Sequence, residues 1–261
     1  FWLVLIVIAF ILGTRVFLQG QDLSVFDRSI DSSMRSGDPS EQHHQSVDAI
    51  AGMFGTGEES KDRKAQLSES RKAMNESGDT ADMTGVRLQE VVADGVPAEW
   101  VLVEGADPQK RLLYIHGGGF MMGSPRSHRV ITTTLSRITN ASILAIDYRL
   151  TPENKRVACI EDCQAAYKWI LDNGPDGQAG APSSFFIAGD SAGGNLTLMS
   201  IAWARDMGLP AVNAAVALSP LTDSTFSSPS MRSNIETDHM LGPSLAPMTK
   251  MPQMLRAWIG L

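Results

Sequence analysis

The sequence has little of what several common classes of protein require. Two of its 261 residues are cysteine, Cys159 and Cys163, and their spacing of four puts both on one face of an expected helix. Because neither CxxC spacing nor a neighbouring histidine accompanies them, they are interpreted as small core residues rather than as a redox pair or half of a metal site. They leave the redox compartment open, and no metal site is predicted.

Runs of basic residues are also lacking. The formal net charge is −7, with 22 Lys and Arg against 29 Asp and Glu. A protein that binds nucleic acid needs clustered positive charge to meet the phosphates, so no nucleic-acid partner is predicted. The hydrophobic share of 43% and the charged share of 20% are ordinary for a globular protein. A chain of this length can bury one sizeable core.

Long apolar stretches are absent except at the beginning. Residues 1–18 are apolar with Arg15 as their one charge, and as a helix they would reach about 27 Å, just short of a bilayer's hydrocarbon core of about 30 Å. No small-x-small cleavage site follows, so a membrane anchor is favoured over a signal peptide, with a buried helix as the third alternative. The protein is therefore expected to be membrane-anchored or exported, and otherwise cytoplasmic. Phe1 in place of methionine leads us to expect further residues upstream.

A polar segment follows, from residue 21 to residue 82. Its apolar residues are sparse, but those at 47, 50, 53 and 54 recur at the helical period. One or two amphipathic helices outside the main core are predicted, joined by flexible polar segments. The expected organisation is therefore a hydrophobic segment (1–20), a polar helical cap or linker (21–82) and a main domain (83–261).

From residue 83 onward, short apolar runs alternate with helical stretches. A pair of strands is expected within 91–103, and further strands at 112–115, 143–146, 185–188 and 214–218. Helices are expected at 130–138, 157–172 and 192–206. Continuous apolar strands that alternate with helices are typical of a parallel sheet covered on both faces. The main domain is therefore predicted to be an open α/β structure.

Residues 189–193 (Gly-Asp-Ser-Ala-Gly) form a G-x-S-x-G motif between an expected strand and an expected helix. This context predicts a sharp turn that exposes the Ser191 hydroxyl above the sheet. The positive end of the following helix then lies beside it. The N–H of Ala192 would point at an oxyanion that forms on a bound carbonyl group.

A second glycine motif, 116–120 (His-Gly-Gly-Gly-Phe), directly follows another expected strand. The three consecutive glycines, Gly117, Gly118 and Gly119, allow backbone N–H groups to converge on one point, as in an oxyanion hole. A flexible loop without a ligand is the alternative. His116 is interpreted as a residue that braces this loop rather than as a base, because it has no route to the Ser191 hydroxyl without displacing the loop.

Together these segments resemble the hormone-sensitive-lipase-like esterases of the α/β-hydrolase superfamily. The resemblance covers about residues 90–261 and rests on four segments in order: 116–120, 147–153 (Asp-Tyr-Arg-Leu-Thr-Pro-Glu), 189–195 and 218–223 (Leu-Ser-Pro-Leu-Thr-Asp). It implies an α/β-hydrolase fold with a mostly parallel sheet, helices on both faces and a helical N-terminal cap. It also implies Ser191 as nucleophile, with Gly118, Gly119 and Ala192 as oxyanion donors.

The resemblance further implies carboxylic esters as substrates, no cofactor, and a cap formed by residues 23–75. The family usually has alanine where this chain has Thr151. We expect the difference to be tolerated, since Arg149 and Glu153 beside it are kept. These two residues are interpreted as an ion pair that braces the oxyanion loop, with a solvated surface pair as the alternative.

The base that a serine nucleophile needs is not evident. In α/β-hydrolases an acidic residue and then a histidine follow the serine, and in the family they follow two further strands. After Leu218 no strand is predicted: 221–248 is rich in loops and 251–261 reads as a helix. His239 is interpreted as a cap or surface residue, with the role of base as the alternative, and Asp223 belongs to the 218–223 segment. The sequence is therefore expected to be truncated at both ends, with the acid and base of the triad beyond Leu261.

Two functions of different classes remain. The first is a carboxylesterase that acts on short- to medium-chain acyl esters through an acyl-enzyme intermediate, with lactones and amides as related substrates. The second is a catalytically inactive protein of the same fold that binds a small apolar ligand. The intact 189–195 segment favours the first, because a pure binding protein does not need a strained serine at that turn. A small-molecule ester is the expected partner, and the oligomeric state is not predicted.

Overall fold

A computed structural model describes residues 2–18, 37–54, 62–223 and 228–242 of the chain. By its internal contacts the chain divides into two units, residues 1–52 and 53–261. The predicted boundaries at residues 20 and 82 stay a prediction, since this division does not address the role of either segment.

The first unit contains helix α1 (Trp2–Leu18), and helix α2 (Glu41–Phe54) begins in it. The expected amphipathic helix around residues 47–54 is thus confirmed, whereas the apolar residues at 25–34 lie outside the described residues. α1 has 17 residues, which corresponds to about 26 Å of helix. Within the described ranges no helix is both long and apolar enough to cross a membrane. That residues 1–18 form a membrane anchor stays a prediction.

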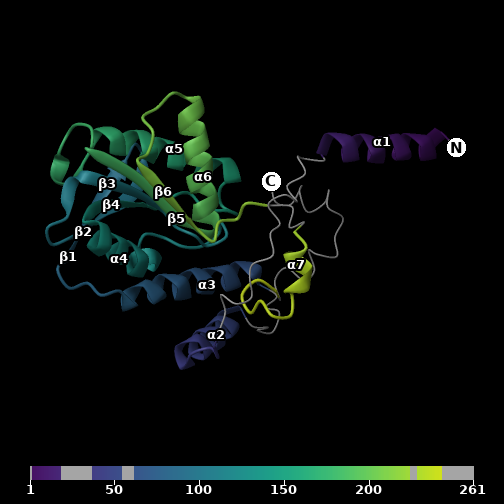
Figure 1. The fold of residues 1–261 in the computed structure, drawn as a ribbon, viewed down its shortest axis with the longest axis horizontal. Helices are drawn as coiled ribbons and strands as arrows, with labels where there is room; N and C mark the ends of the chain where they lie inside the picture. The colour runs from purple at the N-terminus through teal and green to yellow at the C-terminus, as the bar shows by residue number, and fades with distance from the viewer. Residues whose placement is uncertain (1, 19–36, 55–61, 224–227, 243–261) are drawn as a thin grey trace. The chain divides into compact units, whose positions relative to one another are not determined.

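The second unit is built on a sheet with six strands among the described residues (Figure 1). The order across the sheet is β1-β2-β4-β3-β5-β6. Strands β4, β3, β5 and β6 are parallel to one another. At one end of the order β1 pairs antiparallel with β2, and β2 pairs antiparallel with β4. The strands are β1 (Val86–Ala93), β2 (Val96–Val103), β3 (Asp107–Ile115), β4 (Ala141–Ile146), β5 (Ser184–Asp190) and β6 (Ala214–Leu218).

The hairpin between β1 and β2 has a two-residue turn, Asp94-Gly95. Both residues have positive φ, 51° and 88°, which is the backbone geometry that such short turns need to follow the twist of their strands. The two strands are therefore longer than the apolar runs near 91 and 100 alone predicted, and every residue of β1 faces a partner in β2.

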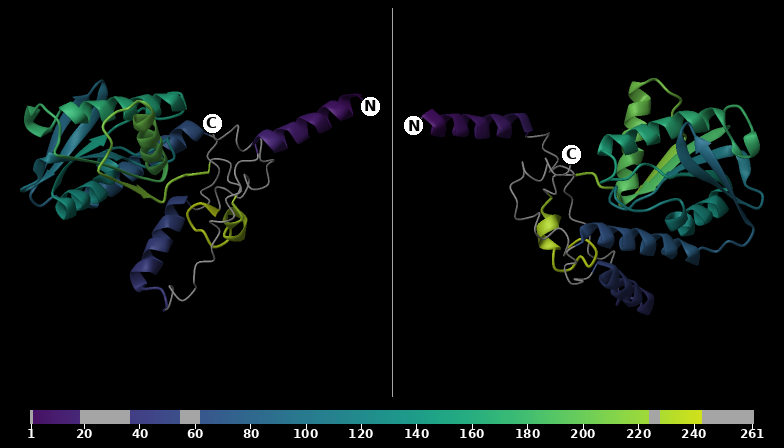
Figure 2. Two further views of the ribbon diagram at one scale, coloured as in Figure 1. Left: turned by 45° about the horizontal axis from the view of Figure 1, so that its top comes forward. Right: turned by 180° about the vertical axis from the view of Figure 1, so that it is seen from behind.

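Helices cover both faces of this sheet, as predicted. Helix α4 (Arg129–Thr139) packs on one face, and helices α5 (Arg156–Asp172) and α6 (Ser191–Asp206) pack on the other. Helix α3 (Arg63–Ser77) lies on the same side of the sheet as α4 (Figures 1 and 2) and contacts the turn Arg126–His128 that precedes α4. After β6, the described residues 228–242 contain one helical turn, α7 (Ser230–Ser233), and no strand.

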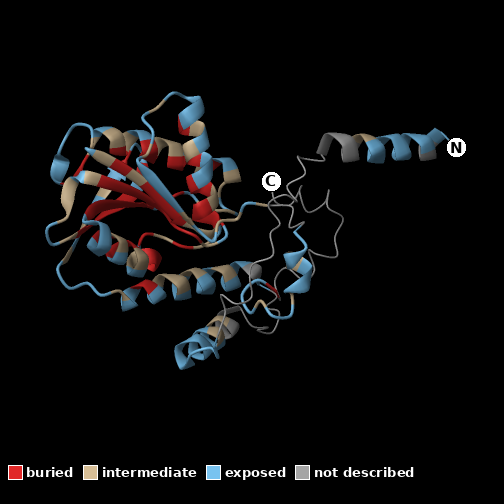
Figure 3. Cartoon of the chain, in the orientation of Figure 1, coloured by how far each residue is buried: buried red, intermediate tan, exposed pale blue. Residues whose placement is uncertain are grey.

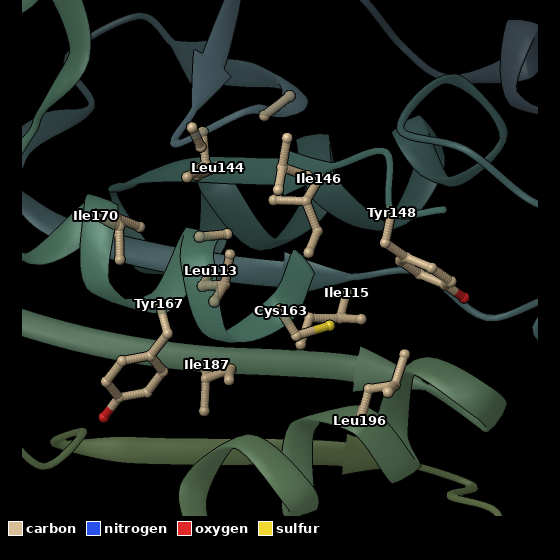
Figure 4. Close-up of a cluster of buried hydrophobic side chains, with 14 of the residues drawn as sticks. Leu113, Ile115, Leu144, Ile146, Tyr148, Cys163, Tyr167, Ile170, Ile187 and Leu196 are labelled. Carbon is tan, nitrogen blue, oxygen red and sulfur yellow. The ribbon is translucent and has the colours of Figure 1, made fainter. Parts of the chain in front are cut away.

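The main core lies between the sheet and the α5–α6 layer, and buried positions follow the central strands (Figure 3). Both cysteines of α5 are buried there as free thiols, in agreement with the packing interpretation. Figure 4 shows the centre of this cluster, with side chains from three strands, both helices and the β4–α5 connection: Leu113, Ile115, Leu144, Ile146, Tyr148, Cys163, Tyr167, Ile170, Ile187 and Leu196.

Strand β6 differs from the prediction of continuously buried strands. In β6, Val216 and Leu218 are 47% and 40% exposed, because β6 pairs with β5 on one side and is the outermost strand of the described sheet on the other. The central strand β4, in contrast, is buried at all six positions. Apolar character alone therefore did not predict which of these two strands is exposed among the described residues.

Candidate active site

Ser191 stands at the junction of β5 and α6, where the sequence predicted it. Its φ is +51°, a left-handed conformation that costs a residue with a Cβ about 1–2 kcal/mol. Such strain is found at sharp strand-to-helix turns that lift a nucleophile above a sheet. Ala192 follows in the first turn of α6 and is buried, so its N–H is among those that lack a partner within the helix.

The glycines around Ser191 are required by close approach of backbone. A Cβ on Gly193 would collide with the carbonyl oxygens of Ile115, the last residue of β3, and of His116, which follows it. A Cβ on Gly189 would lie 2.6 Å from the Ile115 carbonyl oxygen. The start of α6 thus sits directly on the end of β3, which brings Ser191 beside the loop that leaves β3.

That loop, residues 116–122, contains three consecutive residues with positive φ. Gly118 and Gly119 have φ values of +114° and +62°, and Phe120 follows with +63°. The carbonyl of Gly118 accepts the N–H groups of Met121 (3.1 Å) and Met122 (2.9 Å). The described residues offer no hydrogen-bond partner for the N–H groups of Gly118 and Gly119, as an oxyanion hole needs. We call residues 116–122 the glycine loop below.

Asp190 ties the glycine loop to the turn that holds Ser191. Its Oδ1 accepts the N–H of Gly117 at 2.9 Å and the hydroxyl of Tyr114 at 2.7 Å, and its Oδ2 lies 3.4 Å from Nε2 of His128. Burial raises the pKa of the Asp190 carboxyl, but hydrogen bonds from His128, Tyr114 and Gly117 outweigh it and leave the pKa below its usual value. Asp190 therefore serves as a charged acceptor that fixes the start of the loop.

His116 supports the glycine loop from inside the fold. Its ring is buried and stacks on Tyr148 at 4.2 Å between centroids, and the Tyr148 hydroxyl donates to the His116 carbonyl at 2.8 Å. Nδ1 lies 2.7 Å from the Gly117 carbonyl oxygen, which only accepts, so Nδ1 carries the proton. Burial, followed by the neighbouring His128, lowers the pKa of His116 to about 3. A group with so low a pKa is a poor proton acceptor, which agrees with the bracing interpretation.

The predicted ion pair between Arg149 and Glu153 is wrong. Arg149 turns toward α5, where its guanidinium binds Asp162 at 2.7 Å and Glu161 at 3.1 Å. Glu153 faces α3 and binds Arg71 through both carboxylate oxygens, at 2.9 and 2.8 Å. The turn that carries Glu153 does contact the glycine loop, since the N–H and hydroxyl of Thr151 both donate to the Phe120 carbonyl.

His239, the alternative base, lies in the short segment after α7 and is exposed. Among the described residues no hydrogen bond or ion pair joins it to Ser191, and the same holds for Asp223. The expectation that the acid and base of the triad lie beyond Leu261 stays a prediction. Among the residues that the structure describes, no three His, Cys, Asp or Glu side chains gather in a group that could hold a metal ion.

The sequence interpretation missed four residues that shape this site. Asp190 was visible inside the 189–193 motif, and Tyr114 lies one residue before the end of the apolar strand 112–115. Neither position indicates from the sequence which residue it contacts. His128 lies at the beginning of α4, and Arg71 lies in a segment predicted to be a cap or linker. The detectable signal for Arg71 was a polar spacing of four, which continues at Asn75 and Asp79.

Comparison with known proteins places the chain in a family. The family model for the α/β-hydrolase fold matches residues 112–259, more than half of the chain and including the glycine loop and Ser191. The chain belongs to the α/β-hydrolase family. This confirms the fold predicted from the sequence.

Two solved structures similar to this α/β-hydrolase are esterases. One is EstE5 soaked with p-nitrophenyl butyrate, with a TM-score of 0.69 and 33% identity over 80% of this chain and 68% of that one. Another is an esterase from the bacterial hormone-sensitive lipase family, with a TM-score of 0.68 and 30% identity over 85% of this chain and 73% of that one. The resemblance to the hormone-sensitive-lipase-like esterases is therefore confirmed.

Curated relatives of this α/β-hydrolase carry related names. An acetyl-hydrolase of Streptomyces hygroscopicus is 36% identical over 162 residues, which are 62% of this chain and 52% of the relative. The carboxylesterase/phospholipase LipF of Mycobacterium tuberculosis is also 36% identical over 162 residues, 62% of this chain and 40% of the relative. The chain thus spans about half the length of these curated relatives, or less.

Proposed function

We propose that the complete gene product hydrolyses carboxylic esters, with Ser191 as nucleophile and an acyl-enzyme intermediate. The observation that carries the proposal is the strained Ser191 at the start of α6, held beside a glycine loop by Asp190. A binding protein gains nothing from this strain. The names of the related proteins, an acetyl-hydrolase and several carboxylesterases, support the same chemistry.

In the first step Ser191 Oγ forms a bond to the acyl carbon, and the carbonyl oxygen becomes an oxyanion. The N–H groups of Gly118, Gly119 and Ala192 are the donors that would stabilise this charge. Donors fixed in advance lower the barrier without reorganisation, and losing one typically costs about 3 kcal/mol. Collapse of the intermediate releases the alcohol, and water then attacks the acyl-enzyme by the same route.

The hydroxyl proton of Ser191 needs an acceptor, and a histidine oriented by a carboxylate is the usual one. His116 is unsuited to this task, because its ring is buried under the glycine loop and its pKa is lowered to about 3. The order of triad residues in this fold puts the histidine after Ser191. We therefore propose that the base comes from the part of the protein that follows β6.

Short- to medium-chain acyl esters are the proposed substrates. One relative is an acetyl-hydrolase, and the EstE5 crystal was soaked with a butyrate ester. Both names point to small acyl groups. The inactive binding protein that the sequence left open is not favoured, since the relatives are named as esterases and acetyl-hydrolases.

The test is steady-state hydrolysis of p-nitrophenyl acetate, butyrate and octanoate by the complete gene product. Ser191→Ala should lower kcat by about 10⁴- to 10⁶-fold, because a serine enzyme retains little beyond the oxyanion hole when the nucleophile is removed. Ser183→Ala is the matched control. Ser183 precedes the first residue of β5, at the end of the strand away from Ser191, and its hydroxyl donates to the Gln109 carbonyl. Equal turnover by wild type and Ser191→Ala would refute the proposal.

A further inference from the structure

Helix α3 and the turn after it present a polar stripe to residues 121–126, which overlap the end of the glycine loop. The stripe consists of Arg71, Asn75 and Asp79, spaced by four residues, so that all three face one side of a helix and of the turn that continues it. Figures 1 and 2 show α3 alongside the sheet domain on the side of α4. Within residues 62–82, which the structure describes, this stripe carries the polar contacts to the end of the glycine loop and the residues after it.

Each member of the stripe has a partner in residues 121–126. Arg71 Nε donates to the Met121 carbonyl at 2.7 Å. Asn75 accepts the Ser124 hydroxyl at 2.6 Å. Asp79 binds the Arg126 guanidinium through both oxygens, at 2.8 and 2.5 Å.

The backbone approaches as closely as these contacts suggest. Gly78 ends α3 against the carbonyl of Arg126, and a Cβ at that position would collide with it. α3 and the segment 121–126 are therefore joined along their length rather than at one point.

Arg71 differs from the other two because it joins three separate pieces. Besides Met121, its guanidinium donates to the Thr151 carbonyl at 3.0 Å and to both oxygens of Glu153, at 2.9 and 2.8 Å. Thr151 in turn donates to Phe120. The far end of the glycine loop and the turn after β4 are thus held by one planar cation whose donors point in fixed directions.

The three glycines of this loop cannot hold its conformation by side-chain packing; besides Arg71, the Thr151 N–H and hydroxyl hold the loop at the Phe120 carbonyl. Gly117, Gly118 and Gly119 carry no side chains that could pack, and glycine reaches positive and negative φ at similar cost. At its beginning the loop is held by Asp190. At its end Met121 is 43% exposed, and its carbonyl is held by Arg71.

We propose that Arg71 is a positioning residue for the oxyanion hole: by holding the Met121 carbonyl and the 151–153 turn together, it keeps the N–H groups of Gly118 and Gly119 directed at the substrate carbonyl. This rests on the proposed function, in which those groups stabilise the oxyanion. Arg71 does not contact the substrate, and its effect passes through the loop. The role gives α3 a part in catalysis beyond that of a cap over the acyl pocket.

The role predicts a specific kinetic effect. An oxyanion hole acts on the transition state, so misdirected N–H groups lower kcat more than they change KM. A displacement of about 1 Å in a positioning group can cost up to about 100-fold in rate. If Arg71 merely attached the cap, its loss would change stability or KM and leave kcat intact.

The experiment compares Arg71→Met and Arg71→Lys with Arg87→Met in the complete gene product. Arg87 is the matched control, because it makes a bidentate ion pair with Asp176, at 2.8 and 2.7 Å, away from the site. With p-nitrophenyl butyrate, Arg71→Met should lower kcat by about 10- to 100-fold and change KM less than about twofold. Arg71→Lys should recover part of the loss, and Arg87→Met should match wild type.

Hydrogen–deuterium exchange of the amides in residues 117–122 gives a readout that needs no turnover. Exchange there should be faster in Arg71→Met and unchanged in Arg87→Met. Unchanged exchange in Arg71→Met would overturn the proposal, as would an unchanged kcat despite faster exchange. If the wild type hydrolyses no ester, the proposed function fails, and the exchange result then decides alone whether Arg71 holds the loop.

Discussion

Removing the hydroxyl of Tyr114 should weaken the fold at the point that joins the nucleophile to the glycine loop. Tyr114 is 1% exposed, and its hydroxyl donates to Asp190 Oδ1 at 2.7 Å. Burial, and then the charge of Asp190, raises the pKa of the Tyr114 phenol, so the hydroxyl remains a donor at any ordinary pH. Tyr114→Phe keeps the ring and deletes this one bond.

The size of the effect follows from the charge on the acceptor. A hydrogen bond to a charged group contributes about 1.5–3 kcal/mol, against about 0.5–1.5 kcal/mol for a neutral pair. Tyr167→Phe is the matched control: Tyr167 is also fully buried, and its hydroxyl donates to the neutral carbonyl of Pro210 at 2.8 Å. Urea unfolding should therefore show Tyr114→Phe to be about twice as costly as Tyr167→Phe.

The pH dependence separates a charged acceptor from a neutral one. The pKa of Asp190 in the fold lies below its ordinary value of 3.8, so its contribution to stability is complete above that value and is lost as the pH falls through the lower, folded-state pKa. The cost of Tyr114→Phe should shrink over the same range, while that of Tyr167→Phe stays constant. Equal costs for the two variants at pH 7 would refute the role assigned to Asp190.

Three further predictions concern the same region. Gly193→Ala should destabilise the protein by more than about 3 kcal/mol in urea unfolding, because its Cβ would collide with backbone oxygens of Ile115 and His116 that cannot yield; a loss under about 1 kcal/mol would contradict this contact. His116→Gln should flatten the loss of stability in acid: the pKa of His116 is about 3 in the fold and 6.5 otherwise, so the unfolded state alone binds its proton between these values, and wild type should lose about 1.4 kcal/mol per pH unit more than the variant there. Thr151→Ala should cost less than about 1 kcal/mol, since the Thr151 N–H still donates to the Phe120 carbonyl when the hydroxyl is gone; a larger loss in urea unfolding would mean that threonine is needed here.

The parts of this site that follow from local sequence could be predicted. The turn at Ser191 needs a strand, a helix and small neighbours, all of which are contiguous in 185–206. The glycine loop likewise follows directly from β3. For both, the physical requirement and the residues that meet it are adjacent along the chain.

The parts that depend on distant pairs could not be predicted in the same way. Arg149 and Glu153 are four residues apart and of opposite charge, which suggested a pair, but the turn between them directs one side chain toward α5 and the other toward α3. Glu153 and its true partner Arg71 are separated by 82 residues. Charge and spacing indicate that two residues could meet, whereas the packing of the helices decides whether they do.

Exposure to solvent is a second property that the local pattern does not carry. β4 and β6 are both continuous apolar runs, yet β4 lies between two strands and β6 has one neighbour among the described residues. The 218–223 segment, which begins at the last residue of β6, contacts the nucleophile turn, since Leu221 donates its N–H to the Ser191 carbonyl at 3.1 Å. That contact joins the end of β6 to the nucleophile turn.

The central claim is that Ser191 attacks the substrate, and covalent trapping tests it most directly. The complete gene product would be incubated with a fluorophosphonate, and the adduct located by mass spectrometry of its peptides. We expect a single adduct on Ser191, absent from Ser191→Ala and present in Ser183→Ala. An unlabelled wild-type protein, or an adduct that persists in Ser191→Ala, would contradict the assignment of Ser191 as nucleophile.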